Sequence, residues 1–143
     1  MTLHTVAWLI LRLAITWLFL TPVFGLVRDW DGTKQLIRLI SPMWVNFFAV
    51  CCVAIMIIGS LSVLFGFYAQ IGAMFLCVYC VLGIRVHYQL AKTIAQSAVP
   101  GDGDALGIAG HISSGQKNVV LAAVCLFIVV FGSGPLSLTT LLW

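Results

Sequence analysis

The amino-acid sequence predicts an all-α integral membrane protein. We expect a bundle of four membrane-spanning helices with a short amphipathic segment between the first two. The chain of 143 residues is 62% hydrophobic and only 8% charged, whereas a soluble domain carries about 25% charged residues. The mean hydropathy of +1.15 agrees with this class. Because the length suits one compact unit, we expect a single domain over residues 1–143.

Four apolar runs are long enough to cross a bilayer, whose hydrocarbon core of about 30 Å needs about 20 helical residues. The predicted spans are approximately residues 5–27, 43–67, 70–89 and 113–131. Ser41-Pro42 is a helix-starting pair ahead of the second span. A very short turn before the third span makes the second and third spans an antiparallel hairpin, and Pro135 follows the end of the fourth.

The two polar connections differ in character. In the first, RDWDGTKQLIRLIS (residues 28–41), apolar residues alternate at helical spacing with Lys34 and Arg38. This pattern predicts a short amphipathic helix at the membrane interface. The second, AKTIAQSAVPGDGDALGIAGHISSGQKN (residues 91–118), is expected to be largely flexible. Its GDGD offers two carboxylates but lacks the other ligands of a calcium loop, so we interpret it as a glycine-rich turn.

The basic residues of the loops predict an orientation. Four spans place both termini on one side, and the loop cations fall on the side of the two connections: Arg28, Lys34, Arg38, Lys92 and Lys117. By the positive-inside rule, the connections are cytoplasmic and both termini face outward across the plasma membrane. The chain has no basic run, so nucleic acid is not an expected partner.

The cysteines all fall inside apolar runs, which excludes a secreted disulfide framework. Cys77 and Cys80 have the one-turn spacing of thiol redox motifs, but such motifs need a lowered thiol pKa. Both lie in the middle of a predicted span, where an apolar setting opposes the thiolate. We therefore favour packing cysteines, with redox-active thiols as the alternative. The spacings provide no metal or haem site.

Arg12 is a charged residue inside the first predicted span. It lies about 10 Å below the surface at 1.5 Å per residue, where an arginine costs at least about 2.5 kcal/mol. Trp8 and Thr16 flank it one turn away and could supply a cation–π contact and a hydrogen bond. Two interpretations stay open: a structural or ligand-binding role inside the bundle, or a long side chain that reaches back to the interface.

Arg85, His87 and Tyr88 lie at the cytoplasmic end of the third predicted span. We favour an interfacial belt, in which such residues anchor at the level of the headgroups. The alternative is a polar pocket for a quinone or a lipid headgroup, with His87 exchanging protons near neutral pH. Cys80 and His87 are about 10.5 Å apart along one helix, which excludes a Cys–His nucleophile pair.

Three stretches resemble the DoxX family of small membrane proteins: LILRLAITWLFL, which contains Arg12; IIGSLSVLFGFYAQIGA; and HISSGQKNVVLAAVCLFIVVFGSGPLSL. The resemblance implies a four-helix membrane protein associated with quinone-linked oxidation of sulfur compounds or thiols. It also implies structural or site roles for Arg12 and for Lys117-Asn118. The sequence departs from the family pattern in two places. The second helix lacks an acidic residue before its glycines, and Leu136 stands where a basic residue is common.

These observations lead to two hypotheses on function. In the first, the chain is an accessory subunit of a membrane-bound redox system, with an oxidoreductase partner and a quinone near Arg12 and the third span. In the second, it is a non-catalytic scaffold or assembly factor in the bilayer, with a partner subunit or further copies of itself. A small transporter ranks third, because no inverted repeat is visible and Arg12 alone is a charge deep in a span.

Overall fold

The computed structural model describes residues 2–96, 101 and 103–138. Five helices make up most of this part of the chain: α1 (Leu3–Arg28), α2 (Trp30–Arg38), α3 (Val45–Phe65), α4 (Ala69–Ala95) and α5 (Asp104–Phe131). Four of them, α1, α3, α4 and α5, are long and apolar enough to cross a membrane. The prediction of an all-α, multi-pass membrane protein is therefore confirmed.

The hairpin of α4 and α5 is longer than the sequence suggested. α4 continues to Ala95, and α5 begins at Asp104 rather than near Ser113. Most of the connection that we expected to be flexible is therefore helical. At this level the two helices lie close together, since a Cβ added at Gly107 would lie 3.4 Å from Cδ1 of Ile94. Such packing stabilises helical segments that their local sequence favours only weakly.

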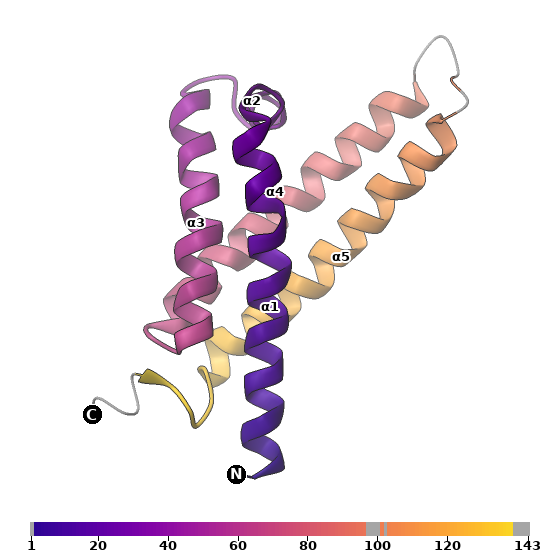
Figure 1. Ribbon diagram of the computed structural model, residues 1–143. Coiled ribbons are helices and arrows are strands. Elements are labelled where there is room, and N and C mark those ends of the chain that lie inside the picture. Colours follow the sequence, from indigo (N-terminus) through magenta and orange to yellow (C-terminus); the bar gives the residue numbers. More distant parts are fainter. Residues whose placement is uncertain (1, 97–100, 102, 139–143) are drawn as a thin grey trace.

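The helices converge at one end and separate at the other (Figure 1). α4 and α5 make the most extensive contact, followed by α3 with α4 and α1 with α3. We call the end that carries the first turn of α1, the α3–α4 turn and the last turn of α5 the terminal end. The opposite end, with α2 and the last turn of α4, is the connection end. Figure 1 shows the α4–α5 hairpin leaning away from α1 and α3 towards the connection end.

The tight α3–α4 turn depends on backbone conformations that most residues avoid. Gly66 has φ +68° and Tyr68 has φ +47°, both in the left-handed region. Just beyond the turn, α3 crosses α4 at two glycines. A Cβ added at Gly72 would lie 2.9 Å from the carbonyl oxygen of Gly59. Small residues at such a crossing allow two membrane helices to approach closely.

The core lies where all four long helices meet. Its largest fully buried side chains come from each of them: Ile15, Phe19, Met56, Val63, Leu76, Cys80, Cys125 and Ile128. Many large apolar side chains on the outer faces are exposed, including Trp17, Phe24 and Val130. A lipid environment accommodates such a surface, which a water-soluble protein of this size rarely presents.

The predicted amphipathic helix is present as α2. The Asp29 side chain caps it by accepting a hydrogen bond from the backbone N–H of Gly32 at 3.0 Å. On the inner face of α2, Thr33 and Ile37 are buried, whereas Arg38 of the same helix is exposed. Figure 1 shows α2 nearly end-on beside the last turn of α1, so that its axis runs across the connection end. This is the placement of a helix that lies at a membrane interface.

Candidate functional site

Arg12 lies inside the bundle at its terminal end, with only 3% of its surface exposed. It does not reach back to the interface. Its Nε donates to the carbonyl oxygen of Val63 at 2.9 Å, and Nη2 donates to the carbonyl oxygen of Leu64. Nη1 donates to the carbonyl oxygens of Ser133, at 3.4 Å, and Leu136. Four of the five N–H donors of the guanidinium are thus engaged by the backbone.

The acceptors of Arg12 are backbone groups that need a partner. Val63 and Leu64 belong to the last turn of α3, which carries the negative end of the helix dipole. Carbonyls in a last turn lack the full set of intrahelical partners, although the Val63 carbonyl also accepts from the backbone N–H of Gly66 at 3.2 Å. One turn along α1, the Thr16 hydroxyl donates to the carbonyl oxygen of Ser60 at 3.2 Å. Together, Arg12 and Thr16 join α1 to the end of α3 through polar contacts shielded from lipid.

The segment after α5 folds back to meet Arg12. The chain turns at Gly132 (φ +77°) and Gly134 (φ +81°), conformations that favour glycine. A Cβ added at Gly134 would lie 2.5 Å from Cγ of Trp8. Close packing against α1 therefore requires a glycine at 134, whereas Gly132 is favoured by its backbone conformation alone. Two carbonyls of this GSGPLSL stretch complete the shell around the guanidinium.

Trp8 contributes to this cluster in a different way from the one we expected. Its ring stacks on Phe127 of α5, with centroids 5.5 Å apart, and its Nε1 donates to Nε2 of His4 at 3.0 Å. Thr16 likewise donates to α3 rather than to the guanidinium. Trp8 and Thr16 therefore lie one turn from Arg12, as expected, but they bond to other residues and not to the guanidinium.

The cysteines occupy the helix interfaces as free thiols. Cys80 is fully buried, and Cys77 is half-buried with its Sγ 3.6 Å from the carbonyl oxygen of Ala122 in α5. Cys125 of α5 is near enough to interact electrostatically with both. The sequence did not reveal this third thiol, because it depends on the register of α5 against α4. Among the residues that the structure describes, no three side chains are grouped to hold a metal ion.

The three polar residues near the end of α4 lie on different sides of the helix. Tyr88 is 73% exposed and Arg85 is also exposed, whereas His87 is half-buried. Nδ1 of His87 lies 3.2 Å from Nδ1 of His111 on α5. The structure thus separates Arg85 and Tyr88 from His87. Whether any of them contacts a quinone stays a prediction.

His111 is a partner that sequence reasoning missed, because we expected it in a loop. The two imidazole rings lie 5.5 Å apart, and Lys117 of α5 interacts electrostatically with His87. One turn nearer the core, the buried Asn118 fits against Gly83, where an added Cβ would lie 2.5 Å from its Nδ2. A longer helical assignment for residues 104–112 would have placed His111 opposite His87.

The fold and these contacts define a multi-pass membrane protein whose polar interior residues join its helices. The DoxX family model matches residues 7–89, from α1 through most of α4. Since this range is more than half of the chain, the protein belongs to the DoxX family. No curated protein and no solved structure gives a significant match. The GSGPLSL stretch, which also suggested the family, lies beyond the matched range.

Proposed function

We propose that the protein is an accessory subunit of a membrane-bound system that oxidises sulfur compounds or thiols and passes the electrons to quinone. The observation that carries this proposal is membership of the DoxX family through the match over residues 7–89. The family resemblance implies an association with quinone-linked oxidation of sulfur compounds. The four spanning helices supply a membrane anchor for such a system.

The placement of the reactive groups supports an accessory role rather than catalysis by this chain. The Arg12 guanidinium is bonded to four backbone carbonyls, which leaves little capacity to bind a substrate anion. Cys80 and Cys125 are fully buried between helices. A thiol acts as a nucleophile only as the thiolate, and an apolar interior disfavours that charged form.

The arrangement of the polar residues of α4 favours an interfacial belt over a quinone site formed by this chain alone. Arg85 and Tyr88 are exposed on the outer side of the helix, where they suit an interfacial belt, and His87 faces α5. We therefore propose that the partner oxidoreductase provides most of the quinone site. His87, which lies against His111, is the group of this chain that we propose to exchange a proton with it.

The test uses membranes from a strain that lacks the gene. Quinone reduction is followed after addition of thiosulfate or a small thiol, and the strain is complemented with the wild-type chain. We expect the rate to fall in the deletion strain and to return on complementation. A variant with all five cysteines replaced by alanine should restore the rate equally. Unchanged quinone reduction in the deletion strain would contradict the proposal.

The second candidate is a scaffold or assembly factor, and the structural use of Arg12 and the buried thiols favours it. The same deletion strain separates the two. An accessory subunit leaves the partner oxidoreductase in the membrane with a lower turnover. A scaffold leaves less of the partner in the membrane, with the turnover per remaining molecule unchanged. Quantitative mass spectrometry of membrane fractions, measured beside the quinone assay, distinguishes these outcomes.

A further inference from the structure

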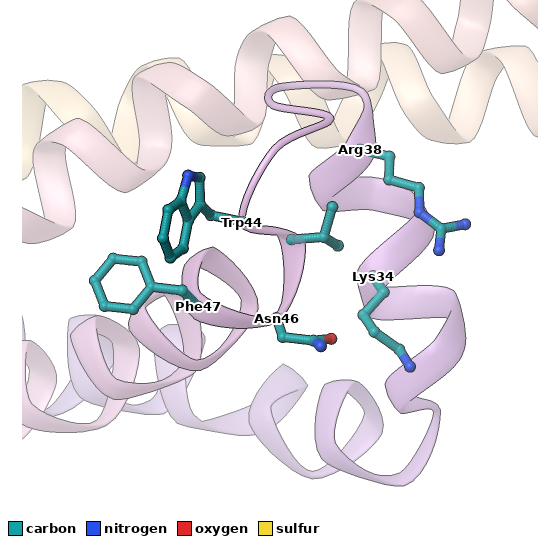
Figure 2. A pocket seen from close by; sticks show the side chains of 6 residues that line it. Lys34, Arg38, Trp44, Asn46 and Phe47 are labelled. Atoms are coloured by element: carbon teal, nitrogen blue, oxygen red, sulfur yellow. The ribbon is translucent and has the colours of Figure 1, made fainter.

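An open pocket of about 590 Å³ lies between α2 and the start of α3, at the connection end. Its lining consists of Lys34, Arg38, Trp44, Val45, Asn46 and Phe47. Figure 2 shows the polar ends of Lys34, Arg38 and Asn46 on one side of the pocket and the rings of Trp44 and Phe47 on the other. The pocket is therefore amphipathic, with a cationic half and an aromatic half.

The cationic half has donors that the protein itself does not satisfy. Arg38 is exposed and makes no hydrogen bond or ion pair with any residue in the described part of the chain. Asn46 is exposed at the first turn of α3, and its side-chain amide also lacks such a partner among the described residues. An anion that enters the pocket would meet these groups without having to break contacts with the protein.

Lys34 has one internal partner, which an anion would have to share or displace. Its Nζ lies 2.5 Å from Oδ1 of Asp31, and this contact with Lys34 lowers the pKa of the Asp31 carboxyl. Asp31 is 86% exposed, so water screens the pair and its contribution to stability is small. The ammonium can therefore turn from Asp31 to a ligand at little cost.

The aromatic half suggests where the ligand comes from. Trp44 and Phe47 are 73% and 60% exposed, and aromatic side chains of this kind collect at the boundary between headgroups and hydrocarbon. α2 runs across the same end of the bundle (Figure 1). A lipid headgroup at this level would lie against Lys34 and Arg38, and its glycerol and upper acyl chains would contact the two rings.

We propose that this pocket binds a phosphate-bearing anion, and that its source is the headgroup of an anionic phospholipid. The phosphate would accept charge-assisted hydrogen bonds from Arg38 and Lys34 and a further bond from the Asn46 amide. The proposal adds a ligand site to the protein and does not depend on its redox association. It also fits the predicted orientation, because anionic lipids favour basic residues on the cytoplasmic leaflet.

The experiment is a titration of the full-length protein in a zwitterionic detergent, followed by native mass spectrometry. The probes are phosphatidylglycerol and phosphatidylcholine with the same acyl chains. We expect phosphatidylglycerol to bind more tightly. Each Lys or Arg near an anionic headgroup contributes about fivefold in affinity. The double variant Lys34→Gln/Arg38→Gln should therefore lower the affinity for phosphatidylglycerol by about 25-fold.

A matched control removes the same charge elsewhere on the connection side. Arg28→Gln/Lys92→Gln alters two exposed cations that do not line the pocket, and it should reduce binding far less. Asp31→Asn should strengthen binding severalfold, because it frees Lys34. A damaged fold would not mimic that gain. Equal losses in the two double variants, or no loss in the pocket variant, would overturn the proposal.

A competition with inorganic phosphate distinguishes a phospholipid headgroup from a soluble phosphate compound as the ligand. It lacks the parts that would contact Trp44 and Phe47, so we expect it to displace phosphatidylglycerol only at a large excess. Phe47→Ala should then weaken the lipid and leave phosphate unchanged. If phosphate binds as tightly as the lipid and Phe47→Ala has no effect, the lipid source is wrong and the ligand is a soluble phosphate compound.

Discussion

The two ends of the bundle use arginine in opposite ways. At the terminal end, Arg12 is 3% exposed and the chain supplies oxygen acceptors from α3 and from the segment after α5. At the connection end, Arg38 is exposed and no described residue bonds to it. In a chain with so few charges, the availability of backbone carbonyls decides whether a cation holds helices together or stays free for a ligand.

The helices also pack more closely at the terminal end than at the connection end. The terminal end combines glycine contacts, a tight turn and the stacked rings of Trp8 and Phe127. At the connection end the α4–α5 hairpin leans away from α1 and α3 (Figure 1), although α4 and α5 make the most extensive contact of any two helices. We therefore expect substitutions at the terminal end to affect global stability, and those at the connection end to affect local structure or binding.

The largest effect is expected for Arg12→Gln. It removes a buried charge and takes this donor from the carbonyls of Leu64, Ser133 and Leu136. Unpaired buried carbonyls cost about 1–3 kcal/mol each, so we expect a loss of about 3 kcal/mol or more in unfolding free energy. Thermal unfolding in detergent measures it. Arg38→Gln is the matched control; an equal loss there would contradict the comparison.

Gly134→Ala should have the next largest effect. Gly134 has φ +81°, and a Cβ there would lie 2.5 Å from the Trp8 ring. The left-handed backbone alone costs about 1–2 kcal/mol for a residue with a Cβ. Gly110→Ala in α5 is the control, because nothing lies within 4 Å of its added Cβ, and it should stabilise the helix by up to about 1 kcal/mol. Similar melting temperatures for both variants would be inconsistent with this packing.

A smaller, pH-dependent effect is expected at the connection end. The His87–His111 contact needs one protonated and one bare Nδ1, so a proton added to the bare nitrogen removes it. Lys117 is near enough to repel a charged His87, which adds to this effect. Spin labels at Thr93 and Leu106, in a cysteine-free background, should show a broader distance distribution in acid than at neutral pH. His111→Asn should remove the pH dependence; persistence would assign it to other groups.

The smallest effect is expected for Thr16→Val, which keeps the shape of the side chain but removes the hydrogen bond to Ser60. Hydrogen bonds between membrane helices contribute about 0.6 kcal/mol on average. Thr21→Val is the control, since the exposed Thr21 bonds only within its own helix, to the carbonyl oxygen of Trp17. A larger loss of unfolding free energy for Thr16→Val than for Thr21→Val would show that the Thr16–Ser60 hydrogen bond stabilises the terminal end. Equal losses would show that it does not.

The class of fold and the four spans could be predicted because they depend on local properties. Apolar length marks a spanning helix, and the alternation around Lys34 and Arg38 marks α2. The extension of α4 and α5 over residues 90–95 and 104–112 could not be predicted in the same way. It depends on the packing of one weakly helical segment against another.

The candidate sites were less accessible to sequence reasoning, because their partners are distant in the chain. The position of Arg12 in a span indicated importance, but its acceptors lie 51 to 124 residues away. His87 was identified without His111, and Cys77 and Cys80 without Cys125, because both depend on the register of α5. The pocket combines Lys34 and Arg38 of α2, which the sequence analysis identified, with four residues at the start of α3 that it did not identify: Trp44, Val45, Asn46 and Phe47.

The central claim is that Arg12 holds the terminal end together while the connection end is organised independently. Hydrogen–deuterium exchange of the full chain in lipid nanodiscs tests it directly, by comparing the wild type with Arg12→Gln. We predict faster exchange at the α3–α4 turn and at residues 132–138, with little change in α2 and at residues 104–112. Equal acceleration at both ends, or no change at the terminal end, would contradict the claim.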